Sequence, residues 1–224
     1  MHKEKENPAY NTEANRSDEA RFSVSWMYGS RVSSLLSYSI SREMRDDLHF
    51  DDNISAKDRD VKKDKFFGSI TSFISEDISL TTSYLYMRNK VNQDIHYRSG
   101  ITPEIFLSDP SVPYQDSASD YSVVLSYAPV DNMNFDAGIS HTIIKGTFYP
   151  SEQDLTEPVS IASFSEFKAN ETVYSAGGEY RFRTGYTTGF KYRYMDINEV
   201  TDNPHDDITD GKLHVFLLTI SKRW

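Results

Sequence analysis

Two acidic stretches are the first candidates for chemistry in this sequence. DDLHFDDN (46–53) and DNPHDDITDG (202–211) each gather aspartates around one histidine. Hard cations such as Ca²⁺ bind carboxylate oxygens, but neither stretch has the ligand spacing of an EF-hand loop. We interpret both stretches as solvated loops, so the sequence predicts no metal site and no cofactor. The chain also contains no cysteine, which excludes disulfides, thiolate metal sites and covalent haem attachment.

A histidine in an apolar setting is the other candidate for catalysis. His141 alternates with Ile139 and Ile143, so it shares their side of a predicted strand. Outer-membrane phospholipases place a histidine and a serine on the lipid-facing wall of a barrel, but no hydroxyl residue stands two positions from His141. We therefore expect His141 to lie at the end of its strand, and we expect no enzymatic activity.

The elements that carry these residues show a period of two. In ARFSVSWMYG (20–29), large apolar residues alternate with residues that are mostly polar. This alternation is typical of a β-strand whose two faces meet different environments. The same pattern predicts nine strands, at 20–29, 32–42, 65–75, 78–88, 120–129, 132–144, 172–183, 185–195 and 212–224.

The gaps between these strands are alternately short and long. The long gaps are 43–64, 89–119, 145–171 and 196–211, and most acidic residues fall in them or in the polar segment 1–19. Short turns at one end and long loops at the other are typical of an outer-membrane β-barrel. We therefore expect an antiparallel transmembrane barrel meander over 20–224, with the four long gaps as external loops and 1–19 as an external loop or tail.

Charged residues within the predicted strands keep to the polar face, as a lipid-facing wall requires. Asp136 and Glu179 are the acidic residues that this reading places inside strands. Arg42 and Arg88 share the apolar face but fall at strand ends, where long cationic side chains can reach water. The residues predicted to line the lumen are Arg21, Asp136, Glu179, Arg181, Lys191 and Arg193. They either set the ion preference of a pore or pair with one another in a filled interior.

Tyrosines concentrate on the apolar face, mostly toward the strand ends. A phenol buries its ring and keeps its hydroxyl wet, so rings of this kind gather at both lipid–water boundaries. The predicted aromatic girdle comprises Tyr28, Tyr38, Tyr84, Tyr86, Tyr121, Tyr127, Tyr174, Tyr180, Tyr186 and Tyr194.

The final stretch, GKLHVFLLTISKRW (211–224), resembles the closing strand of bacterial outer-membrane barrels, which ends on an aromatic residue after alternating apolar positions. The resemblance implies that the barrel-assembly machinery reads this strand. The residues that would form its signal are Phe216, Leu218, Ile220 and Trp224, although Lys222 stands where an apolar residue is usual. Nine is an odd number, whereas single-chain bacterial barrels have an even one. Either a strand is missed or the chain is the C-terminal portion of a larger barrel, as the lack of a signal peptide at its start favours.

We expect the chain to form a porin-like barrel in a Gram-negative outer membrane, surrounded by lipid. The barrel would be either a passive pore or a transmembrane housing. The chain also resembles, more weakly, the haem-free sheath of porin–cytochrome conduits, which implies a multihaem cytochrome as a partner. A soluble all-β binding or adhesion domain is the remaining alternative, because a sandwich with one wet face shows the same alternation. The formal net charge of −10 argues against nucleic acid as a partner, and we expect none.

Overall fold

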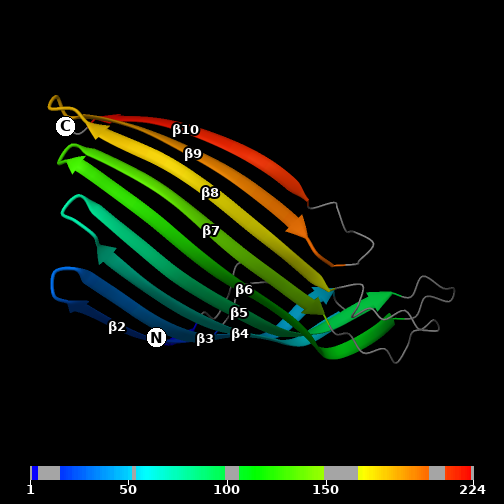
Figure 1. Cartoon of the computed structure of the whole chain (residues 1–224). Coiled ribbons are helices and arrows are strands. Elements are labelled where there is room, and N and C mark those ends of the chain that lie inside the picture. Colours follow the sequence, from blue (N-terminus) through cyan, green and yellow to red (C-terminus); the bar gives the residue numbers. More distant parts are fainter. Residues whose placement is uncertain are drawn as a thin grey trace.

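The computed structural model describes residues 2–4, 16–51, 54–98, 106–148, 166–201 and 210–222. These residues form one antiparallel sheet in which every strand pairs with its neighbours along the chain (Figure 1). The short strand β1 is followed by nine long strands. The strands are β1 (His2–Glu4), β2 (Arg16–Tyr28), β3 (Val32–Asp51), β4 (Ile54–Phe73), β5 (Ile78–Arg98), β6 (Phe106–Val130), β7 (Met133–Phe148), β8 (Phe167–Arg181), β9 (Tyr186–Glu199) and β10 (Gly211–Lys222). The predicted all-β meander of nine strands is confirmed, with β1 as an addition that the alternation did not reveal.

The four short turns all lie at one end of the sheet, on the left in Figure 1. Two of them use glycine where the chain needs a positive φ: Gly29 between β2 and β3 has φ 58°, and Gly185 between β8 and β9 has φ 83°. A residue with a side chain is strained there, because its Cβ meets the neighbouring carbonyl. The predicted tight turns are therefore observed, and all of them lie at this end of the sheet.

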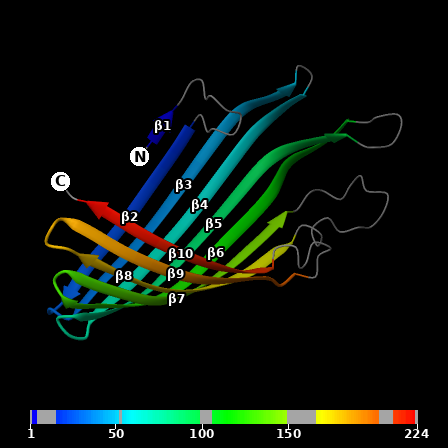
Figure 2. The same cartoon turned by 90° about the horizontal axis from the view of Figure 1, so that it is seen from above.

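The sheet is curled but not closed. In Figure 2 the strands pass from β2 outward to β7 and return to β10, so the two ends of the meander lie on the same side of the middle strands. Among the described residues, β10 pairs only with β9, and β2 only with β1 and β3. The expected closed barrel is therefore observed as an open, curved sheet.

The predicted boundaries of the long gaps were wrong, because the strands run well past them. Most of 43–64 belongs to a hairpin of β3 and β4, which pair as far as Asp51 and Ile54. Similarly, β5 continues to Arg98 and β6 begins at Phe106. In these extensions charged residues such as Asp60, Lys62 and Asp64 stand on the face that is apolar elsewhere, so the alternation weakens while backbone pairing continues. Shorter extensions occur at 145–171 and 196–211, and β2 begins inside 1–19 at Arg16.

The structure also corrects the prediction that acids within strands are confined to Asp136 and Glu179, both in the extensions and at Asp120, the first residue of the predicted strand 120–129. Asp60 and Asp64 lie in β4, and Asp120 lies in β6. The first two stand on the same face as the large apolar residues, which period-two reasoning had reserved for uncharged side chains. Their cross-strand partners, described below, explain how they are accommodated.

Candidate functional site: the two faces of the curled sheet

The register places most of the large apolar residues of the nine long strands on one face. Phe22 stands opposite Tyr38, which stands opposite Phe66. Farther along the sheet, Val123 stands opposite Ile139, which stands opposite Tyr174. Directly opposed residues of an antiparallel pair point to the same side, so this face is continuous from β2 to β10.

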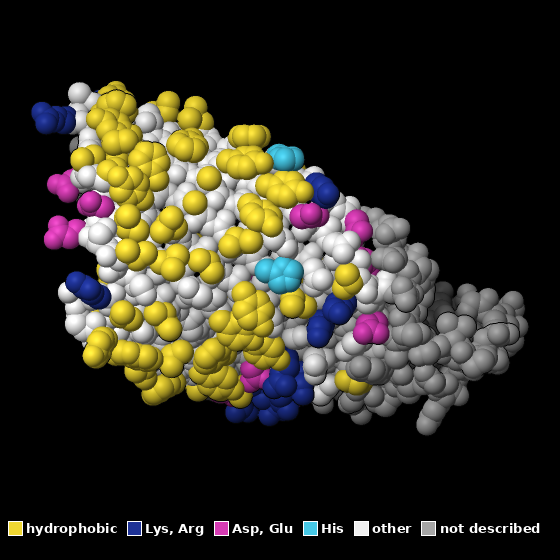
Figure 3. All heavy atoms as spheres, viewed as in Figure 1, with side chains coloured by type: hydrophobic (Ala, Val, Ile, Leu, Met, Phe, Trp, Pro, Cys, Tyr) yellow, Lys and Arg dark blue, Asp and Glu magenta, His cyan; other side chains and the backbone are white. Residues whose placement is uncertain are grey.

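This apolar face is the convex one. Figure 3, viewed as in Figure 1, shows apolar side chains spread over it, and Figure 2 shows that the middle strands bulge toward the same side. Exposure on β10 agrees: Phe216 and Leu218 on this face are 79% and 75% exposed, whereas Val215 and Leu217 on the other face are 37% and 55% exposed. No described element covers the convex face.

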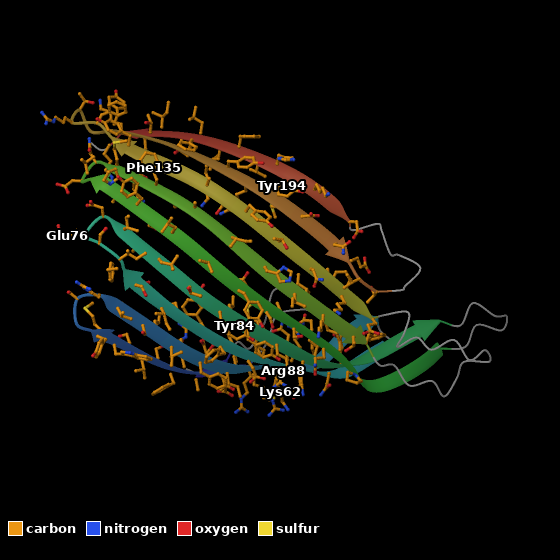
Figure 4. All side chains as sticks on the ribbon, in the orientation of Figure 1. Lys62, Glu76, Tyr84, Arg88, Phe135 and Tyr194 are labelled. Carbon is orange, nitrogen blue, oxygen red and sulfur yellow. The ribbon has the colours of Figure 1, made fainter. Side chains whose placement is uncertain are left out.

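All ten residues of the predicted aromatic girdle lie on the convex face. Tyr28, Tyr127, Tyr180 and Tyr186 stand beside the short turns. The other six stand farther along their strands, where Tyr84 and Tyr121 approach to 4.9 Å between ring centroids and Tyr174 and Tyr194 to 6.1 Å. These six are Tyr38, Tyr84, Tyr86, Tyr121, Tyr174 and Tyr194. Figure 4 labels Tyr84 and Tyr194 on this side of the sheet.

The concave face is lined by hydroxyl groups that pair across strands. Ser23 and Ser37 approach to 2.9 Å between their Oγ atoms, and Ser83 and Ser122 to 2.6 Å. Thr142 donates a hydrogen bond of 2.8 Å to Asp120. Such pairs satisfy polar groups locally and add modestly to sheet stability. Hydroxyl groups are therefore a main component of this face, beside scattered charged and apolar side chains.

The six predicted lumen residues all lie on the concave face, but the structure does not bring them into one cluster. The Glu179 carboxylate lies 2.9 Å from Nε of Arg181, two residues along the same strand. Lys191 stands opposite Gly177 and Arg193 opposite Ser175, so neither directly faces Glu179. Asp136 also stands opposite Gly177, and Arg21 lies far away on β2, 3.0 Å from Glu19.

The predicted assembly residues are only partly described. Phe216, Leu218 and Ile220 lie on the convex face of β10, and Phe216 packs against Tyr192 at 4.8 Å between ring centroids. Lys222, which departs from the pattern, has its ammonium 5.1 Å from the centroid of the Tyr186 ring. Trp224 lies outside the described residues.

Sequence reasoning missed a charged cluster that borders the apolar area on β3, β4 and β5. Arg42 donates to both carboxylate oxygens of Asp60, at 2.9 and 2.8 Å. Arg88 donates to Asp64 at 2.6 Å, and the Tyr38 hydroxyl donates to the same carboxylate at 3.2 Å. Each partner lies on a different strand, so only the register could reveal these pairs. We expected Arg42 and Arg88 to extend into water, whereas the structure shows both guanidinium groups paired with carboxylates.

Electrostatics in this cluster follow from the pairing. Asp60 lies beyond the apolar area, and the hydrogen bonds from Arg42 hold the pKa of Asp60 below its ordinary value. The opposing effect of partial burial is smaller. Asp60 therefore remains ionised at neutral pH, and its charge compensates that of Arg42.

Among the described residues, His141 does not stand in a recognisable catalytic group. His141 accepts or donates a hydrogen bond of 3.0 Å through Nδ1 with Thr172 on the neighbouring strand. Within the described residues no three histidine or acidic side chains gather in a way that could hold a metal ion. The acidic stretches 46–53 and 202–211 fall largely outside the residues whose side chains are described. No helix among the described residues is long and apolar enough to cross a membrane.

Comparisons of the chain with protein-family models, with curated proteins and with solved structures found no match.

Proposed function

We propose that the curled sheet is part of the wall of a transmembrane β-barrel in the outer membrane of a Gram-negative bacterium, serving a passive pore or a housing. The observation that carries this proposal is the convex face. It presents a continuous apolar surface that no described element covers, and such a surface is unfavourable in water. A bilayer would solvate it without a second layer of protein.

The dimensions of the apolar area support the same conclusion. On β5 it runs from Ile78 beside the short turn to Tyr86, and Arg88 follows. A tilted transmembrane strand needs about 9–11 residues to cross the hydrocarbon core. Tyrosines stand at both limits of the area, as they do at lipid–water boundaries. Residues 87–98 would then extend beyond the membrane as part of a paired hairpin.

Two adjacent valines of β6 provide a matched test. Val123 lies on the convex face and Val124 on the concave face. Because the chain has no cysteine, single Val123→Cys and Val124→Cys variants can carry an environment-sensitive label without background. We expect a label at 123 to be quenched by brominated lipid and a label at 124 by aqueous iodide. Equal iodide quenching at both positions, in a protein folded without detergent, would support the soluble alternative and contradict the proposal.

A groove on the concave face favours the housing over an empty pore. It has a volume of about 440 Å³; Leu35, Phe67 and Leu85 form its apolar side, and Arg21, Lys65 and three serines form its polar side. Apolar side chains facing a water-filled lumen are unfavourable, whereas they suit contact with an enclosed partner, such as a multihaem cytochrome. Conductance of the reconstituted protein separates the two roles. Stable ohmic steps from the protein alone would favour a pore, and erratic currents that a bound partner suppresses would favour a housing.

A further inference from the structure

Three cations stand side by side in one cross-strand row on the convex face. Arg42 of β3 is directly opposite Lys62 of β4, and Lys62 is directly opposite Lys90 of β5. Like charges in directly opposed positions destabilise a sheet unless a counter-charge lies between or beside them. Figure 4 shows Lys62 and Arg88 on the same side of the sheet, with Tyr84 between them and the short turns.

The neighbouring carboxylates neutralise only part of this positive charge. Asp60 is occupied by two hydrogen bonds from Arg42, and it lies 3.7 Å from Nζ of Lys62. Asp64 is occupied by Arg88. Both lysines are exposed, and no ion pair of Lys90 occurs among the described residues. Asp18 of β2 stands directly opposite Arg42 and lies 3.4 Å from Arg16. With this pair the described cluster holds five cations and three carboxylates, and it carries about two surplus positive charges.

An apolar groove continues from this cluster toward the short turns. It has a volume of about 670 Å³ and runs across strands β2 to β7. Small residues such as Gly68 and Thr82 form its floor, and Phe66, Tyr84 and Tyr121 rise beside it. Phe66 is four residues from Lys62 on the same strand, a separation of about 13 Å along the chain. The groove and the cations therefore lie in line along the strands.

We propose that this part of the convex face binds one membrane lipid whose headgroup is a phosphate monoester. The phosphate would lie against Lys62 and Lys90, and an acyl chain would lie in the groove. A phosphate monoester carries between one and two negative charges near neutral pH, which matches the surplus charge of the cluster. Lysine binds phosphate as a point charge, so the site needs no fixed fork geometry.

This inference rests on the proposed membrane location, which the labels at 123 and 124 test separately. If those labels report lipid and water as expected but no lipid preference is found, only the binding site is wrong. If the label at 123 reports water, both proposals fail.

The test compares lipids that share acyl chains and differ in headgroup. The protein is reconstituted in phosphatidylcholine containing a small fraction of spin-labelled phosphatidic acid, a phosphate monoester, or spin-labelled phosphatidylglycerol, a diester. Electron paramagnetic resonance then measures the fraction of each lipid that the protein immobilises. We expect a preference for phosphatidic acid of about fivefold, roughly the factor that one further basic residue contributes at an anionic membrane surface. Equal retention of the two lipids would overturn the proposal.

Paired variants localise the effect. Lys62→Gln/Lys90→Gln should reduce retention of phosphatidic acid to that of phosphatidylglycerol. The matched control, Lys65→Gln/Lys191→Gln, removes the same charge from the concave face and should leave the preference unchanged. Thr82→Phe fills the groove without changing charge, and it should weaken retention of both lipids. An unchanged preference in the Lys62/Lys90 variant, or an equal loss in the control, would contradict the assigned site.

Discussion

Arg88 of β5 donates two hydrogen bonds to a single carboxylate oxygen of Asp64 on β4, at 3.1 Å from Nε and 2.6 Å from Nη2. The other oxygen of that carboxylate accepts a bond from Tyr38 of β3. Three strands thus meet through side chains where the apolar area of the convex face ends. Because a slip of one residue would move each group to the opposite face, the cluster favours a single register.

The pair should show measurable coupling in a double-mutant cycle. Asp64→Ala, Arg88→Ala and the double variant are compared by urea unfolding of the reconstituted protein. We expect a coupling free energy on the order of 1 kcal/mol, since both groups retain partial solvent contact that screens their interaction. The same cycle at Glu179 and Arg181, which are more exposed and lie on one strand, should give a value near zero. A larger coupling at Glu179 than at Asp64 would contradict this ranking.

Gly178 on β8 should not tolerate a side chain. A Cβ at this position would lie 2.9 Å from ring atoms of both Phe135 and Phe190, which flank it on adjacent strands. Gly178→Ala should therefore lower the free energy of unfolding by about 1–3 kcal/mol, the usual range for overpacking. Gly146→Ala is the control, because the nearest atom to its Cβ would be 3.5 Å away. Thermal unfolding measured for both variants checks the prediction, and equal losses would contradict it.

Charge should be tolerated differently on the two faces of β7. Ile139 is on the convex face in the middle of the apolar area, and Ser140 follows it on the concave face. Ile139→Lys should destabilise the inserted protein by about 2–4 kcal/mol, as for cations at the midplane of a bilayer. Ser140→Lys should change stability much less. Unfolding in lipid bilayers measures both, and similar losses would indicate that the convex face does not meet lipid.

Acid should weaken the contact between β3 and β4. The pKa of Asp60 is lowered by Arg42, so the stabilisation from this pair is present above the ordinary carboxyl pKa and is lost as pH falls through the lowered value. The free energies of unfolding of the wild type and Asp60→Asn should therefore differ at neutral pH and converge below about pH 4. Unfolding by urea between pH 2 and pH 7 checks this. A difference that grows as pH falls would have the wrong sign.

The period-two alternation predicted the nine long strands because alternate residues of each strand contribute to the apolar area of the convex face. Between Ile78 and Tyr86, for example, most residues have a side chain that fits the face on which they stand, and Thr82 and Leu85 are the exceptions. The same reasoning fails beyond Arg88, where Lys90 and Asn92 stand on the face that is apolar up to Tyr86. Backbone hydrogen bonds continue there as far as Arg98, but they leave no pattern in side-chain type.

The charged cluster could not be predicted from the sequence, for a different reason. Lys62 is 20 positions after Arg42 in the sequence, and Lys90 is 28 positions after Lys62. No local spacing marks these residues as neighbours. Their opposition depends on the register of two hairpins. Tertiary pairing likewise decided that Lys191 and Arg193 do not face Glu179, although they share its side of the sheet.

The sequence by itself determined which side chains share a face, because alternation along a strand is a local property of the backbone. Only the tertiary structure decided how far the hairpins extend, which charges oppose one another and that the described sheet remains open. These depend on hydrogen bonds between strands, whose partners a single strand does not specify.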